Sequence, residues 1–344
     1  MTQVVPRPAA FDRFHGDLDA GLKRVVGDRK SVLYAMLRYQ LGWTDQMGMP
    51  DPHAAPDRVL GTMCLLCAEA VGGDPAQALP AAVGVELAHA FGEIHRAIRE
   101  GTPGSADRPK LWWVWGHAQG INAGDGMYAL ARLAVMDLEE KNVEAATVVQ
   151  AAACLDRACL EMCELQHGDI EHESISPRTP ESCVEGLKGR ATLYGCAAEM
   201  GALIGGASAP TAAALSEFGR ETGVAAGARR ELDLVLSATP EARSDLIEAL
   251  DKRRTLPIVY ALSVATDEAR TKLEAAATRQ STLDDDHVDE LKGILEELGA
   301  RDYAARVAGQ HAALAMAALA RADLDEPVAQ QLQQLASYLI GPGR

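Results

Sequence analysis

The pattern of glycine and proline residues most constrains what this chain can fold into. These residues divide the sequence into segments in which Ala, Leu, Glu, Arg and Gln dominate, and only 4% of all residues are aromatic. Few segments alternate β-branched and polar residues as strands do, so we predict an all-α fold. The predicted helices span residues 11–26, 29–42, 57–71, 76–100, 110–140, 143–167, 179–205, 208–223, 225–236, 241–251, 255–264, 267–279, 284–299, 301–321 and 326–340.

The size of the chain allows more than one domain organisation. A chain of 344 residues could form two average domains or one large helical domain. The clearest loops are 101–109 and 47–56, and no gap between predicted helices has the composition of an interdomain linker. We predict a single all-helical domain over residues 1–344, with residues 1–10 flexible.

The charge of the chain excludes one class of partner. The formal net charge is -16 and the pI is about 5.0, whereas binding to nucleic acid or to an anionic membrane surface requires an excess of Lys and Arg. We therefore expect no nucleic-acid partner. No apolar run approaches the ~20 residues that span a bilayer, and the N-terminus lacks the apolar region of a secretory signal. We predict a cytoplasmic protein without a transmembrane segment.

The cysteines predict reduced thiols. There are seven, an odd number, which argues against a disulfide framework. Cys64 and Cys67 form a CxxC motif within an apolar run and are predicted to be buried helix residues. Cys159, Cys163 and His167 follow one another at four-residue spacing, so they could hold zinc from one helix face. A buried stripe of a helix is the interpretation that we favour.

One part of the sequence carries a dense set of motifs. A helix that ends in ELAHAFGEIHRAIRE is followed by a loop with an Arg-Pro pair and then by a helix that contains INAGDG. This order resembles the trans-polyprenyl diphosphate synthases, whose pattern is roughly AxAxELxHxFSLIHDDxxD, RRxRPTxW and INAGDxLxxLA. The matching residues are Glu86, Leu87, His89, Phe91, Ile94, His95, Arg108, Pro109, Trp112, Gly116, Ile121, Asn122, Ala123, Gly124 and Asp125.

The resemblance extends over about residues 32–340. The segment CELQHGDIEHE is similar to the family's GQxxDixxE and retains Gln166, Asp169 and Glu173. EMGALIG resembles ELGALLG, and KRRTLPIVYAL resembles the basic KxTLPxxxAL. The upstream segment YQLGWTDQMGMP is similar to actinobacterial members.

The resemblance implies a fold and a ligand. Members of this family form an all-α helix barrel around a deep apolar cavity that holds a prenyl chain, and they are usually homodimers. The residues expected at this cavity are Phe91, Gly92, His95, Gln166 and Asp169. Phe91 takes the position five residues before the first Asp-rich motif, where a bulky side chain forms the cavity floor in the family. A ligand of roughly ten to fifteen carbons is expected by this analogy.

The sequence departs from the family at the residues that carry its chemistry. The family ionises an allylic diphosphate with magnesium ions that two Asp-rich clusters hold through carboxylate oxygens. The first cluster falls on Arg96, Ala97 and Glu100. The second cluster falls on Arg229, Arg230 and Asp233, or one residue later on Arg230, Glu231 and Leu234. We predict that both motifs are lost, that magnesium-dependent elongation does not occur, and that no cofactor is bound.

Two interpretations of this departure remain open. The first is a pseudoenzyme or accessory subunit that binds a prenyl chain, or that pairs with an active prenyl synthase or terpene cyclase. The second is a non-standard terpene cyclase or prenyltransferase that grips prenyl diphosphate with guanidinium groups in place of metal. The candidate diphosphate-binding residues are Arg96, Arg99, Arg108, Arg229, Arg230 and Lys188.

The sequence also leaves alternatives open for individual residues of this set. Solvated or locally paired arginines are an equally good interpretation of the same pattern. Lys188 is displaced by one position from the family's KT dipeptide, which turns a helical side chain by about 100°. Asp169 and Glu173 are spaced to share a helix face, so they are weak candidates for a relocated magnesium site.

Overall fold

The computed structural model describes most of the chain. The described residues are 5–51, 56–105, 107–175, 178–236, 255–278 and 285–341. Within them, only the backbone is described at residues 168–175, 234–236, 276–278 and 285–288.

Helices account for the regular structure of the described residues, which include no named strand. The helices are α1 (Ala9–Val26), α2 (Val32–Gln40), α3 (Val59–Ala70), α4 (Pro75–Glu100), α5 (Leu111–Trp115), α6 (His117–Met136), η1 (Glu139–Lys141), α7 (Ala145–Ile175), α8 (Pro180–Arg190), α9 (Thr192–Ile204), α10 (Ala209–Leu236), α12 (Leu256–Val264), α13 (Asp267–Thr278), α14 (Asp285–Glu297), α15 (Ala300–Arg321) and α16 (Glu326–Ile340). The predicted all-α fold class is therefore confirmed.

Three predicted helix boundaries are wrong, for local reasons. The predicted helix 110–140 is divided at Gly116, whose φ of 86° lies outside the helical region. The predicted helix 179–205 is divided near Ala191 into α8 and α9. The predicted break near residue 224 does not occur, because Gly223 stays helical and packs against Ala191. The predicted helix 241–251 lies outside the described residues.

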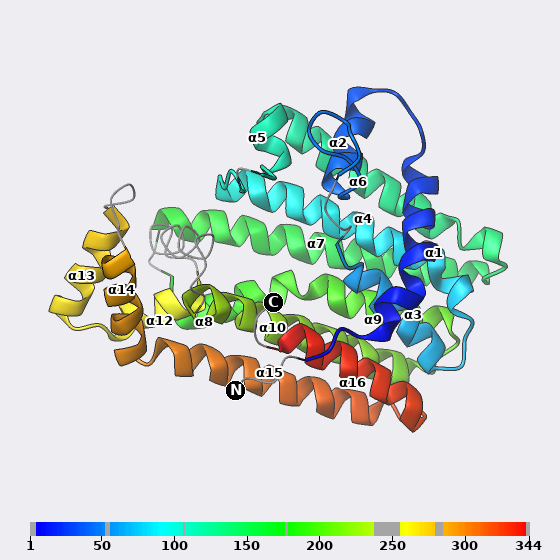
Figure 1. Cartoon of the computed structure of the whole chain (residues 1–344). Helices are drawn as coiled ribbons and strands as arrows, with labels where there is room; N and C mark the ends of the chain where they lie inside the picture. Colours follow the sequence, from blue (N-terminus) through cyan, green and yellow to red (C-terminus); the bar gives the residue numbers. More distant parts are fainter. Residues whose placement is uncertain are drawn as a thin grey trace.

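The long helices α4, α7, α10 and α15 lie roughly parallel and make up the body of the molecule (Figure 1). Helix α9 packs against α3, α4, α7 and α10 and so lies at the centre of the bundle. Its close contact with α3 depends on Gly201, because a Cβ there would overlap the carbonyl oxygen of Cys64. The α3–α9 contact is therefore made backbone to backbone.

The buried apolar side chains form one main cluster and two smaller ones. The main cluster includes residues of α1 to α4, α6, α7 and α9. One smaller cluster lies between α8, α10, α12 and α15. The other lies between α12, α13, α14 and the start of α15. No helix of the described residues is long and apolar enough to cross a membrane.

The cysteines are free, and all except Cys163 are buried. Burial raises the pKa of the Cys67 thiol, and it raises the pKa of Cys159 to about 12. Cys154 on α7 and Cys196 on α9 lie with their sulfur atoms 3.6 Å apart. The predicted burial of Cys64, Cys67 and Cys159 is thus confirmed, but the predicted buried stripe is wrong at Cys163 and His167, which are exposed.

Candidate functional site

The first candidate site lies in the last turns of α4. This helix begins at Pro75, where the Asp74 side chain accepts a hydrogen bond from the Ala76 N–H at 2.9 Å. It ends at Gly101, whose φ of 66° is a left-handed conformation that favours glycine. These two caps define where α4 begins and ends, and Arg96 and Arg99 lie in its last turns.

Arg96 is held by two carboxylates of its own helix. Its guanidinium lies 2.6 Å from a Glu93 oxygen and 3.0 Å from a Glu100 oxygen. Burial alone would raise the pKa of Glu93, but the charges of Arg96 and His89 outweigh it and hold that pKa well below its usual range. The donors of Arg96 are thus already engaged within α4.

Arg99 lies on the same helix end and is largely buried. Its guanidinium is 3.5 Å from Glu100, which also receives Arg96. Glu100 therefore lies between two arginines. Glu100 is the one carboxylate among the residues at the expected first-cluster positions. One of its oxygens faces Arg96 and the other faces Arg99.

The second candidate site lies near the end of α10. Arg229 forms an ion pair with Asp233, four residues later, at 2.6 Å. Arg230 is exposed and forms no ion pair with another residue of the described chain. Both arginines line a cavity of about 310 Å³, which is also lined by Leu339 of α16 and by Gly341 just after this helix. Arg96 is not among the residues of this cavity.

Glu231 is the other acidic residue near the second-cluster positions. Its side chain connects α10 with α8 and α12. One of its carboxylate oxygens accepts from Arg190 of α8 at 2.5 Å. The other accepts from the Leu256 N–H at the start of α12 at 2.8 Å. Lys188 is not part of this group, because it pairs with Glu185 of its own helix at 2.7 Å.

Arg108 is the loop arginine that matches the family pattern. It contacts Tyr39 near the end of α2 and Asp51 in the loop that follows α2. It forms an ion pair with Asp51 and donates to the Tyr39 carbonyl oxygen at 2.6 Å. Its guanidinium also lies 4.8 Å from the centre of the Tyr39 ring. Arg108 therefore anchors the loop that precedes α5.

The predicted cavity residues of α4 pack against neighbouring helices. The Phe91 ring is buried between His95 and Tyr128, with ring centres 4.7 and 5.5 Å away. His95 lies over Gly124 of α6, where a Cβ would overlap the imidazole. A Cβ on Gly92 would lie 2.6 Å from the Met162 sulfur of α7. Gly124 of the INAGDG motif thus has a packing role.

The remaining predicted residues lie on α7. Gln166 is half-buried there. Asp169 and Glu173 belong to the same helix, but their side chains lie outside the described residues. Whether Phe91 forms the floor of a cavity, and whether Gln166 and Asp169 line it, stay predictions.

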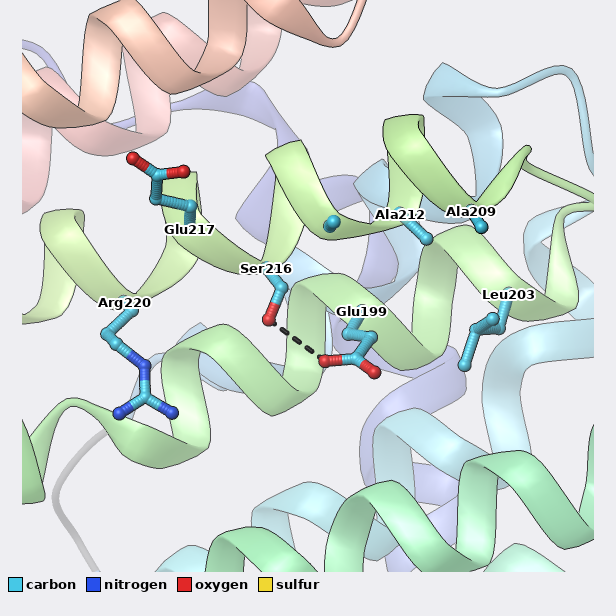
Figure 2. Close-up of a pocket in the computed structure, with 8 residues that line it drawn as sticks. Glu199, Leu203, Ala209, Ala212, Ser216, Glu217 and Arg220 are labelled. Carbon is cyan, nitrogen blue, oxygen red and sulfur yellow. Dashed lines mark hydrogen bonds between the residues drawn. The ribbon is translucent and has the colours of Figure 1, made fainter.

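Figure 2 shows a larger groove between α9 and α10, with a volume of about 460 Å³. Alanine side chains of α10 and Leu203 of α9 form its apolar lining, beside Glu199, Ser216, Glu217 and Arg220. Ser216 donates to Glu199 at 2.9 Å across it, and Arg220 forms a pair with Glu161 of α7. None of the predicted site residues lines this groove.

Metal-ligating side chains are not gathered in the described part of the chain. No group of three or more His, Cys, Asp or Glu residues is placed there to hold a metal ion. Cys159 is buried while Cys163 is exposed, so the two cysteines do not share one environment.

Local pairing was one of the interpretations of these arginines, but the carboxylates that receive them were not identified from the sequence. The spacing of Glu93, Arg96 and Glu100 at three and four residues would have indicated pairing within one helix. No comparable signal exists for Glu231 and Arg190, or for Asp51 and Arg108, because each pair is far apart in sequence.

Comparison with known proteins identifies the class. A model of the polyprenyl synthetase family matches residues 56–295. A solved polyprenyl synthetase from Streptomyces coelicolor A3(2) superimposes with a TM-score of 0.83 at 25% identity, covering 96% of this chain and 99% of that one. The bundle is therefore the all-α isoprenoid synthase fold.

Curated relatives agree with this class. The (2E,6E)-farnesyl diphosphate synthase of Mycobacterium tuberculosis is 29% identical over 313 residues, which cover 89% of this chain and 85% of that enzyme. The short chain isoprenyl diphosphate synthase of Methanothermobacter thermautotrophicus is 31% identical over 264 residues, covering 76% and 79%. The chain belongs to the polyprenyl synthetase family.

Proposed function

We propose that this chain is a non-elongating member of the polyprenyl synthetase family. It acts in isoprenoid metabolism in the cytoplasm as an accessory subunit or pseudoenzyme, which binds a prenyl chain or pairs with an active prenyl synthase or terpene cyclase. The main observation in support of the proposal is that the carboxylates at the expected positions of the two Asp-rich motifs are paired with arginines. Glu100, Asp233 and Glu231 each accept from an arginine.

The residues at these positions are a poor fit to magnesium. Magnesium is held by carboxylate oxygens in near-octahedral geometry, usually beside several waters. A carboxylate that receives a guanidinium carries little remaining negative potential for a dication. The described part of the two helix ends offers only such carboxylates, next to Arg96, Arg99 and Arg229. The proposed function therefore includes no magnesium-dependent reaction step.

A pairing surface is available on α6 and α7. Leu133 on α6 and Val149 and Leu160 on α7 are large apolar side chains that are about 60% exposed. Exposed apolar groups of this size on adjacent helices favour association. We propose that this α6–α7 face pairs either with a second copy of the chain or with an active family member.

A second candidate function is favoured by one observation. Arg230 is exposed at a cavity that it shares with Arg229, and a guanidinium can bind a phosphate group bidentately. A non-standard terpene cyclase or prenyltransferase could hold a prenyl diphosphate there, without metal. A relocated magnesium site at Asp169 and Glu173 belongs to the same candidate.

An elongation assay tests the main proposal. The purified chain is incubated with radiolabelled isopentenyl diphosphate and dimethylallyl, geranyl or farnesyl diphosphate, in magnesium and in EDTA. We expect no prenyl product in either condition. Product that forms at rates typical of the relatives and disappears in EDTA would overturn the proposal.

A second experiment tests the pairing surface. Light scattering gives the mass of the wild type and of Leu133→Glu, which places a charge on the α6–α7 face. We expect the variant to remain monomeric at concentrations where the wild type associates with itself or with an intact relative. Leu314→Glu on α15, also exposed, is the matched control. Equal association of both variants would exclude this face.

A further inference from the structure

All four tryptophans of the chain lie in one part of the molecule. Trp43 follows α2, and Trp112, Trp113 and Trp115 belong to the five-residue helix α5. Tyr39 links the two segments, because its ring packs edge-on against Trp115 at 5.1 Å and its hydroxyl donates to the Pro109 carbonyl oxygen. We call residues 27–51 and 107–117 the tryptophan lobe.

The tryptophan lobe projects from the bundle. In Figure 1, α2, the loop after it and α5 lie together at the upper edge, opposite α15 and α16. At this edge the lobe exposes large apolar side chains: 80% of the surface of Met47, 62% of Met49 and 60% of Trp113 are accessible. Large apolar side chains that are this exposed on neighbouring segments are typical of a binding surface.

The loop structure holds the two methionines outward. The Asp45 carboxylate accepts from the N–H groups of Met47 and Met49 at 2.8 and 2.9 Å, which closes a tight turn. Asp51, at the end of the loop, is fixed by Arg108. The methionines therefore lie at the tip of a turn that is braced at its base.

The tryptophan lobe differs in net charge from the rest of the chain. The lobe carries five Lys and Arg against four Asp, while the whole chain has a net charge of -16. The exposed cations Arg29, Lys30 and Lys110 lie within it. A nearly neutral surface with exposed indole, thioether and ammonium groups suits a zwitterionic lipid headgroup region.

We propose that the tryptophan lobe docks on the surface of a phospholipid bilayer. Met47, Met49 and Trp113 enter the boundary between headgroups and acyl chains, and the exposed cations contact lipid phosphates. The strongly acidic remainder of the chain stays in water. This attachment does not depend on whether the chain turns over a prenyl diphosphate.

Vesicle flotation tests the proposal with phosphatidylcholine vesicles as the probe. We expect the wild type to float with the vesicles, and the triple variant Met47→Ser, Met49→Ser, Trp113→Gln to show a partition coefficient about 10- to 100-fold lower. Leu314→Ser, an exposed apolar residue at the opposite edge, should float like the wild type. Circular dichroism checks that all variants are folded.

Tryptophan fluorescence locates the contact. Brominated phosphatidylcholine should quench the wild type, whereas Trp113→Phe, which lacks the exposed indole, should lose most of the quenching of the vesicle-bound protein. An absence of flotation, or equal flotation of the triple variant, would overturn the proposal. So would flotation that requires anionic lipid, since it would indicate a contact driven by cations alone. A triple variant that changes a dimer into a monomer would assign the lobe to a second copy of the chain instead.

Discussion

The guanidinium of Arg190 on α8 lies 2.5 Å from Oε1 of Glu231 on α10. The same carboxylate accepts the first N–H of α12 through its other oxygen. One side chain near the second Asp-rich position therefore joins three helices, and it is only 13% exposed. This arrangement gives Glu231 a structural role, because its side chain connects α8, α10 and α12.

Removing Glu231 should destabilise the fold. Glu231→Ala leaves both Arg190 and the Leu256 N–H without their acceptor, so we expect a loss of about 2–3 kcal/mol in the free energy of unfolding. Glu231→Gln keeps an acceptor for the N–H and should lose about half as much. Urea unfolding measures both. Glu185→Ala, which removes an exposed pair with Lys188, should change stability by less than about 0.5 kcal/mol.

Arg96→Met should produce a pH-dependent loss of stability. In the wild type the lowered pKa of Glu93 means that its ionised form stabilises the fold above the ordinary Glu pKa, and that this contribution is lost as the pH falls through the lowered value. Without Arg96, burial raises the Glu93 pKa, and ionised Glu93 destabilises the fold at neutral pH.

The expected magnitude follows from the exposure of this pair. About a third of the Glu93 side chain is accessible, so we expect the variant to lose about 1–2 kcal/mol at pH 7 and less at pH 4. Urea unfolding at both pH values measures the difference. Arg321→Met, at an exposed pair with Glu217, serves as the control. A loss that is the same at both pH values would contradict the role given to Glu93.

Two glycines should differ sharply in their tolerance of a methyl group. A Cβ at Gly201 overlaps the backbone of α3 at Cys64, which cannot move alone, whereas a Cβ at Gly92 meets the flexible end of Met162. We expect Gly201→Ala to lose more than about 3 kcal/mol or to be insoluble, and Gly92→Ala to lose about 1 kcal/mol or less. Thermal unfolding and soluble yield compare them. Equal effects would mean that the α3–α9 contact is looser than described.

Binding of farnesyl diphosphate in EDTA tests the second candidate function. Because Arg96 already engages Glu93 and Glu100, Arg96→Ala should leave the affinity unchanged within about twofold. Arg230→Ala should weaken binding about tenfold, since one charge-assisted hydrogen bond contributes about 1.5 kcal/mol. Calorimetry measures both, and farnesol is the control that lacks the anion. Equal affinity of the wild type and Arg230→Ala would exclude this candidate.

The sequence predicts the fold better than the site. Helix periodicity and the motifs around Glu86 and Gly124 are enough to predict an all-α bundle and its family. The break at Gly116 was missed because one glycine within an apolar run does not reveal a positive φ. The arginines were predicted to be candidates for one anion site, which stays a prediction, and the sequence did not specify that Arg96 pairs within α4 and Arg229 within α10. Contacts such as Arg190 with Glu231 depend on tertiary packing, which local spacing does not encode.

The location of the Arg96 and Arg229 pairs has a consequence for how such a sequence could arise. Each arginine is neutralised by a carboxylate three or four residues away on its own helix. A single substitution at either position would therefore need no compensating change on another helix. Changes at the ends of α4 and α10 are therefore independent of one another, and the bundle can remain folded after each of them.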